Sequence, residues 1–107
     1  MDKLYVEMHK DSLAGADLRG ATLTFINIRN ANFRGANLSG ASFLGSFLAG
    51  SDLSNANLSN ANLCIVNLRG ANLSGTNLNG AIFNNKTVWP DGFDPIKAGA
   101  ILSSDFG

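Results

Sequence analysis

The stretch A-D-L-R-G-A-T-L-T-F, from Ala16 to Phe25, holds two consecutive blocks of five residues with one pattern. The pattern continues without an insertion to the block A-I-F-N-N, which ends at Asn85, so that fourteen blocks follow one another. The third place of every block is Leu, Ile or Phe, and we call this place the centre. A period of five residues fits neither an α-helix nor a β-strand, so it indicates a chain that turns at a fixed interval and stacks on itself.

The other places of the block have consistent residue types. Two places before the centre the residue is small, with Ile26 and Val66 as larger exceptions. Since residues two apart in extended chain share a face, both places are expected to point into one interior. Two places after the centre stands Gly or Asn, which tolerate the positive φ of tight turns. Asn and Asp dominate the place before the centre, where we expect stacked amides to bond along a column.

This pattern resembles the A(D/N)LXX motif of the pentapeptide-repeat family over residues 16–85. The resemblance implies an all-β solenoid, namely a right-handed quadrilateral β-helix with one block on each side of a coil. Fourteen blocks at four per coil give about 3.5 coils. Because a short solenoid exposes its last apolar layer, short helical or irregular terminal segments are expected to cap it.

Three regions follow from this interpretation. Residues 1–15 form an N-terminal cap with a degenerate first repeat at Leu13, residues 16–85 form the β-helix, and residues 86–107 form a C-terminal cap with a short helix. The N-terminal cap is expected to be a short helix that covers the first coil. Its apolar residues are Leu4, Tyr5, Val6 and Met8.

The segment after the repeat has its own signals. Val88 is expected at the next centre, and Asp94-Pro95 is expected to begin a short helix over about residues 95 to 102. Trp89 and Phe93 are expected to cover the last coil, with a ligand-stacking pair as the alternative. The run T-V-W-P-D-G-F-D-P also resembles tails of cyanobacterial pentapeptide proteins.

Composition limits the classes of partner. The 107 residues fit one domain, and 8 basic residues balance 8 acidic ones. No net field therefore steers the chain to nucleic acid or to an anionic membrane. No apolar run is long enough to span a bilayer, and the first ten residues lack the apolar core of a secretory signal. A single cysteine, Cys64, excludes an internal disulfide and fits a reducing, cytoplasmic location.

No catalytic or metal-ligating constellation stands out, so neither an enzyme nor a cofactor is predicted. His9 is the single histidine, and Cys64 has no charged neighbour in sequence. The glycines recur at the turn interval and form no phosphate-binding motif. Arg29 and Arg69 are expected to share one column, as a small solvated basic area.

One edge of the predicted prism is unusually apolar. Phe25 and Ile65 occupy the turn place, where a bulky residue with positive φ is an outlier, so a different turn is expected there. An exposed apolar strip of this kind marks a contact site. The alternatives are that a terminal segment covers the strip or that some of its side chains fold inward. The strip is formed by Phe25, Leu44, Phe47, Cys64 and Ile65.

The sequence therefore predicts a non-enzymatic protein–protein interaction or scaffold module, whose partner is another protein or a second copy of the chain. A DNA-mimicking modulator of a type II topoisomerase is the alternative. Such mimicry needs a long, negative surface, whereas the repeat carries two aspartates, Asp17 and Asp52, against four arginines.

Overall fold

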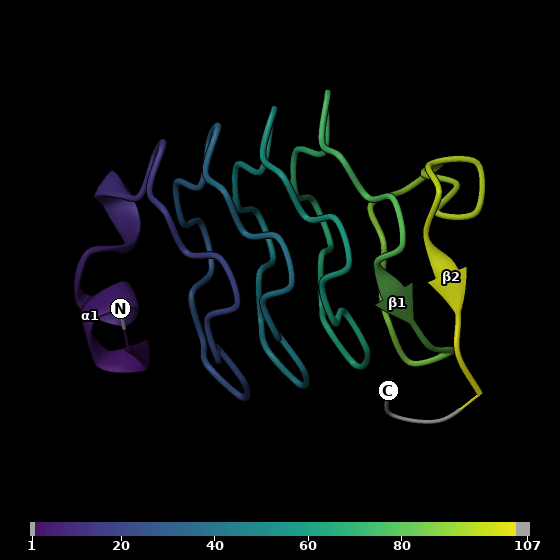
Figure 1. Ribbon diagram of the computed structural model, residues 1–107, viewed down its shortest axis with the longest axis horizontal. Coiled ribbons are helices and arrows are strands. Elements are labelled where there is room, and N and C mark those ends of the chain that lie inside the picture. Colours follow the sequence, from purple (N-terminus) through teal and green to yellow (C-terminus); the bar gives the residue numbers. More distant parts are fainter. Residues whose placement is uncertain (1, 105–107) are drawn as a thin grey trace.

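The computed structural model describes residues 2–104, which wind into a stack of coils (Figure 1). Parallel β-bridges join residues 20 positions apart, beginning with Asp17 and Asn37. A turn closes each block of five, so a coil of 20 residues has four turns and four sides. Because the turns return so soon, each side contributes a single bridge, and the described residues form two named strands, β1 (Ile82–Phe83) and β2 (Ile101–Leu102).

Each side of the stack is a column of blocks, and we number the sides in chain order. Side 1 and side 3 face away from each other across the core, as do side 2 and side 4. Side 1 holds residues 16–20, 36–40, 56–60 and 76–80; side 2 holds 21–25, 41–45, 61–65 and 81–85; side 3 holds 26–30, 46–50 and 66–70; side 4 holds 31–35, 51–55 and 71–75.

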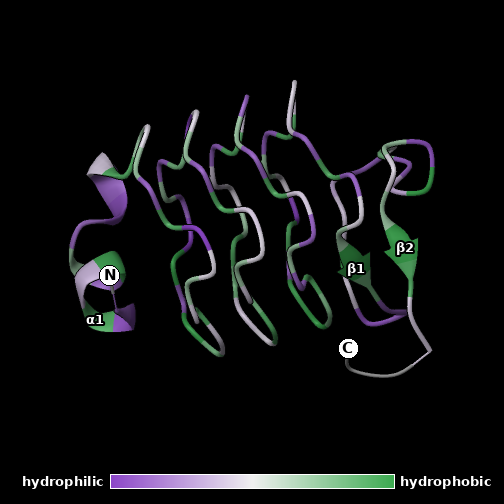
Figure 2. Cartoon of the chain, in the orientation of Figure 1, coloured by the Kyte–Doolittle hydropathy of each residue, from purple (hydrophilic) through white to green (hydrophobic). Residues whose placement is uncertain are grey.

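Backbone hydrogen bonds hold neighbouring coils together. The N–H of Leu18 donates to the carbonyl of Asn37 (2.8 Å), and the N–H of Asn37 donates to the carbonyl of Ala16 (2.9 Å). The same pair of bonds recurs along the stack. Figure 2 shows hydrophobic and hydrophilic residues alternating along each coil, as a chain with one face inward requires.

The interior consists of the block centres and the small places. Phe33 and Phe43 meet edge to face with ring centroids 6.0 Å apart. The larger exception Ile26 is accommodated because the next coil places Ser46 above it, and Val66 follows one coil later. The buried Ser46 hydroxyl accepts a hydrogen bond from the N–H of Ile26 (3.1 Å) and donates one to the carbonyl of Leu23 (2.6 Å).

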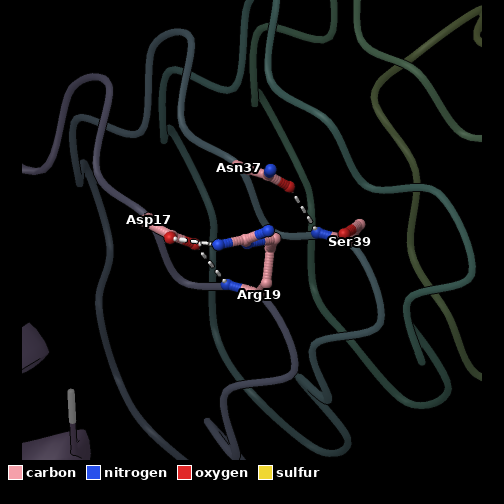
Figure 3. Close-up of polar contacts among 4 residues, drawn as sticks. All are labelled: Asp17, Arg19, Asn37 and Ser39. Carbon is pink, nitrogen blue, oxygen red and sulfur yellow. Dashed lines mark hydrogen bonds and ion pairs between the residues drawn. The ribbon is translucent and has the colours of Figure 1, made fainter.

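The Asn and Asp side chains before the centres act within their own blocks. The side-chain oxygen of Asn37 accepts from the N–H of Ser39 (3.2 Å), and Asp17 accepts in the same way from Arg19 (3.3 Å; Figure 3). Such local bonds fix the start of the next turn. These side-chain oxygens therefore bond within their own block, whereas we expected the amides to bond from coil to coil along the column.

The N-terminal segment packs on the first coil through a short helix. Helix α1 (Lys3–Met8) begins at Asp2, whose carboxylate accepts from the N–H of Tyr5 (2.9 Å), and a 3-10 helix, η1 (Lys10–Ser12), follows. Among the four apolar residues of α1, Val6 is the one that is buried. Leu13 is also buried, as the centre of a block would be.

The register shifts by one residue after the repeat, so the prediction that Val88 is a centre is wrong. Val88 forms a bridge with Asn67, 21 positions earlier, and takes the place before the centre. Trp89 takes the centre and packs on Phe83 and Phe93. The extra residue is accommodated in the turn around Asn84, whose side-chain oxygen replaces a backbone acceptor for the N–H of Ile65 (3.1 Å).

The helix predicted over residues 95 to 102 is also wrong. Asp94 caps a single turn by accepting from the N–H of Lys97 (3.2 Å), and Gly99 ends that turn at φ 96°. The chain then forms β2, which pairs in parallel with β1, and both strands are hydrophobic in Figure 2. Residues 86–102 thus extend the stack beyond the regular repeat. No helix of the described residues has the length and hydropathy to cross a membrane.

Candidate interaction surface

The corner between side 2 and side 3 uses the same turn as the other corners, so the different turn predicted there is wrong. Phe25 and Ile65 adopt φ values of 56° and 60°, close to the 58° of Asn30 at the next corner. The N–H of Phe25 donates to the carbonyl of Leu44 at 2.9 Å, and Asn30 makes the equivalent bond at the same length. These hydrogen bonds between coils hold the backbone at a positive φ, which a bulky side chain disfavours.

The structure brings the predicted strip together but buries one member. Phe25 is 71% exposed and Phe47 is 39% exposed, whereas Leu44 and Ile65 are half-buried. Cys64 is fully buried, so its place in an exposed strip is wrong. The bridge register stacks Cys64 between the residues one coil before and after it, which are both larger. We call the four remaining residues, Phe25, Leu44, Phe47 and Ile65, the apolar corner.

The ring of Phe25 lies over Gly45 in the next coil. A Cβ on Gly45 would overlap two carbon atoms of that ring. The same arrangement recurs with an amide at the next corner, where the Asn30 oxygen lies over Gly50. The ring therefore rests on bare backbone on one side and faces solvent on the other.

Phe47 replaces the Asn or Asp that stands before most centres. Its side chain has no oxygen to accept the N–H of Ala49, and that N–H has no partner within residues 2–104. The Arg29 guanidinium lies 4.8 Å from the Phe47 ring centroid, in the range of a cation–π contact. Side 3 thus presents an aromatic ring with a cation over it.

Basic side chains of α1 and η1 border the same region. The Lys3 ammonium donates to the carbonyl of Thr24 (3.0 Å), next to Phe25 in the chain. The Lys10 ammonium donates to the carbonyl of Arg29 (3.0 Å). The corner therefore has a cationic border on the side of the N-terminal cap.

The charged residues of side 1 form an ion pair, and those of side 4 interact at longer range. Arg19 pairs with Asp17 at 2.7 Å, and its hydrogen bond lowers the pKa of the Asp17 carboxyl below the ordinary value. Hydrogen bonds from Ser54 lower the pKa of Asp52, and the charge of Arg34 lowers it further. Neither carboxylate contributes to side 3.

Residues with the potential for catalysis or metal binding do not converge. Within residues 2–104, no three His, Cys, Asp or Glu side chains gather in a group able to hold a metal ion. His9 stacks on the Tyr5 ring with centroids 4.0 Å apart, and its Nδ1 lies 2.8 Å from the Tyr5 carbonyl oxygen.

Sequence reasoning missed the contact between Arg29 and Phe47, because it placed Arg29 on a plain solvated face. Arg29 and Phe47 are 18 residues apart, which is two fewer than the 20 residues of one coil. The repeat therefore places them on the same face of neighbouring coils, and this was the signal in the sequence. The contacts of Lys3 and Lys10 had no sequence signal, because the path of the cap does not follow the repeat.

The chain belongs to the pentapeptide-repeat family. The family model described as pentapeptide repeats matches residues 12–55, 31–67 and 48–85. Members of this family fold as right-handed quadrilateral β-helices. None of the curated proteins matches this chain.

Several solved structures are similar to this chain. The crystal structure of the pentapeptide repeat protein Rfr23, from the cyanobacterium Cyanothece 51142, is 37% identical with a TM-score of 0.70, over 71% of this chain and 52% of that one. HetL, from the cyanobacterium Nostoc sp. strain PCC 7120, is 38% identical with a TM-score of 0.65, over 72% of this chain and 35% of that one. The alignment thus spans about half of Rfr23 and a third of HetL.

A third solved structure matches over nearly the whole chain. It is another pentapeptide repeat protein of Nostoc PCC 7120, 34% identical with a TM-score of 0.50, over 94% of this chain and 90% of that one. The cyanobacterial type expected from the tail thus agrees with these structures.

Proposed function

We propose that this protein is a non-enzymatic module for protein–protein interaction or scaffolding. Its partner is another protein or a second copy of the chain, bound at the apolar corner. In this proposal the regular sides of a right-handed, four-sided coil support one irregular corner. Membership in a family of structural and interaction modules supports the proposal. HetL, which is similar in fold, is described as involved in the regulation of heterocyst differentiation.

The observation that carries the proposal is that Phe25 is both strained and exposed. A bulky side chain at φ 56° is disfavoured, and Asn or Gly fills this place in the other blocks except at Ile65. Burial does not compensate, because the residue remains 71% exposed. A residue that lowers the stability of the fold and is not buried indicates a role in binding, not in folding.

Phe47 supports the same conclusion through a different cost. On the same side, Asn67 accepts the N–H of Arg69 one coil later (3.0 Å), whereas Asn27 makes no such bond within residues 2–104. Phe47 cannot form the bond that Asn67 makes, and the residue remains 39% exposed. Two aromatic side chains thus occupy one corner against the preference of the repeat, and aromatic residues are enriched at interfaces.

The alternative of DNA mimicry finds no support in the charges. A mimic of DNA needs a continuous row of unpaired negative charge, whereas the Asp17 carboxylate is neutralised by Arg19. A supercoiling assay with a bacterial gyrase is expected to show no effect of the protein.

The test compares partner capture by two variants. Wild-type protein and a Phe25→Asn, Phe47→Asn variant are immobilised and exposed to a cyanobacterial lysate, and captured proteins are quantified by mass spectrometry. Both changes install the residue that the repeat uses elsewhere, so the fold is expected to persist. Asn57→Asp, which changes the same block place on side 1, is the matched control.

The expected result is a partner captured by wild type and by Asn57→Asp, and lost with the double variant. For self-association, sedimentation of the purified protein would show a dimer that the double variant lacks. Identical capture by all three proteins, together with a monomer in sedimentation, would contradict the proposal.

A further inference from the structure

The arginines of side 3 differ from Arg19 on side 1, which has a carboxylate partner. Arg19 on side 1 stands two residues after Asp17 and is paired with it (Figure 3). Arg34 on side 4 makes no ion pair within residues 2–104, although its charge lowers the pKa of the Asp52 carboxyl. Arg29 and Arg69 make no ion pair within residues 2–104.

The sequence of side 3 explains why these two charges are unpaired. The place two residues before Arg29 and Arg69 holds Asn, where the equivalent place before Arg19 holds Asp. Side 3 has none of the eight acidic residues of the chain. Asp2, just before α1, and Glu7 of α1 line a hollow on side 2 together with Lys3 and Thr22.

One of these cations contacts the exposed aromatic ring of Phe47, and the other lies further along the same side. The Arg29 guanidinium lies 4.8 Å from the Phe47 ring centroid, and Arg69 lies in the same column two coils after Arg29. At the spacing of stacked strands, the two arginines are separated by roughly 10 Å, with Ala49 between them. Both arginine side chains are exposed.

We propose that the segment bound at the apolar corner is an acidic peptide with a central apolar side chain. Its carboxylates pair with Arg29 and Arg69, and its apolar side chain packs on Phe25 and Phe47. This inference rests on the proposed function and names the chemistry of the partner. Arginine favours such pairing because its planar guanidinium binds a carboxylate through two hydrogen bonds.

A peptide fits this surface better than nucleic acid does. Arginines and an aromatic ring also bind single strands, through phosphate contacts and base stacking. The apolar corner, however, adds the aliphatic side chains of Leu44 and Ile65, and the chain has no net positive charge. Aliphatic surface beside cations suits a peptide with alternating apolar and acidic residues.

The probe is a random-peptide library displayed on phage, selected on the wild-type protein and depleted on the Phe25→Asn, Phe47→Asn variant. The depletion step keeps peptides that need the apolar corner. An enriched peptide is then synthesised with a fluorophore, and its affinity is measured by anisotropy. A fluorescent single-stranded DNA oligonucleotide is measured in parallel.

The decisive comparison is between arginines on opposite sides. The enriched peptides are expected to carry Asp or Glu around an apolar residue. Arg29→Gln with Arg69→Gln is expected to weaken binding by about tenfold or more, because two charge-assisted contacts are lost. Arg19→Gln on side 1, the matched control, is expected to leave the affinity unchanged.

Each other outcome overturns the inference in a distinct way. Enriched peptides that are neutral or basic, and bind the double arginine variant equally, would overturn the acidic partner and leave the proposed function standing. Tighter binding of the oligonucleotide, with the same dependence on the arginines, would assign the surface to nucleic acid. A dimer that the arginine substitutions dissociate would assign it to a second copy. An empty selection overturns the inference, and the capture experiment then decides the proposed function separately.

Discussion

The ring of Phe25 covers Gly45 of the next coil, and the space that it fills is the space a Cβ on Gly45 would need. Side-chain-bearing residues at three other turn places also face a glycine one coil later: Asn30 faces Gly50, Asn55 faces Gly75 and Asn60 faces Gly80. Glycine therefore has two roles in this solenoid. It permits the positive φ of the turn, and it receives the larger turn residue of the preceding coil.

Gly45→Ala is expected to displace the Phe25 ring and weaken partner binding at the apolar corner. Gly40→Ala is the matched control, since Gly40 has a similar φ (68° against 71°) but no atom within 4 Å of its Cβ position. Both changes are expected to lower the free energy of unfolding by about 1 kcal/mol, because alanine resists positive φ. Urea unfolding measures that cost, and anisotropy with a bound peptide measures affinity. Equal loss of affinity in both variants would contradict the role of the ring.

Phe25→Asn is expected to raise the free energy of unfolding by about 1 kcal/mol, because Asn accepts positive φ more readily than Phe. The partner site would be lost at the same time, since the exposed ring is removed. Thermal unfolding followed by circular dichroism measures the change. A lower melting temperature would show instead that the Phe25 ring is part of the structural core.

The period of five was sufficient to predict a chain that turns at a fixed interval and stacks on itself, and the resemblance to the pentapeptide-repeat family supplied the four-sided coil. The period no longer predicts the structure where a single extra residue changes the register. Val88 and Trp89 are both apolar, so composition did not reveal which is the centre; the extra residue at Asn84 decided it. The expected helix ends after one turn at Gly99, because the chain then forms β2 and pairs with β1. The sequence pattern does not show this pairing.

The candidate site was predictable in outline for a similar reason. The repeat identifies which residues depart from the pattern, and Phe25 and Phe47 departed most visibly. It does not show how much of each side chain the neighbouring coils cover, so Cys64 was placed outside although it is buried. The pairing of Arg19 with Asp17, which leaves the side 3 arginines distinct, also depends on side-chain positions.

Trp89 is expected to tolerate Phe but not Ala. Its ring lies edge to face with Phe83 (5.4 Å) and stacks on Phe93 (5.3 Å), and its buried Nε1 has no hydrogen-bond partner among the described residues. Trp89→Phe keeps an aromatic ring and removes an unsatisfied donor, so it is expected to change the free energy of unfolding by less than about 1.5 kcal/mol. Trp89→Ala leaves the last coil open and is expected to cost about 3 to 5 kcal/mol. Urea unfolding by circular dichroism separates the two, and equal losses would contradict this account.

The stability of the fold is expected to decline in acid partly through Asp52. Hydrogen bonds from the N–H (2.9 Å) and hydroxyl (2.6 Å) of Ser54 stabilise its carboxylate and lower its pKa. Because the folded pKa lies below the unfolded value, this contribution is present above about pH 4 and is lost as the pH falls through the folded pKa. Asp52→Asn keeps an acceptor for Ser54 but cannot titrate, so its melting temperature should fall less than that of wild type below pH 4. The measurement is the melting temperature from pH 7 down to pH 2. Asp11→Asn is the control for general loss of negative charge, and parallel curves for wild type and Asp52→Asn would contradict the assignment.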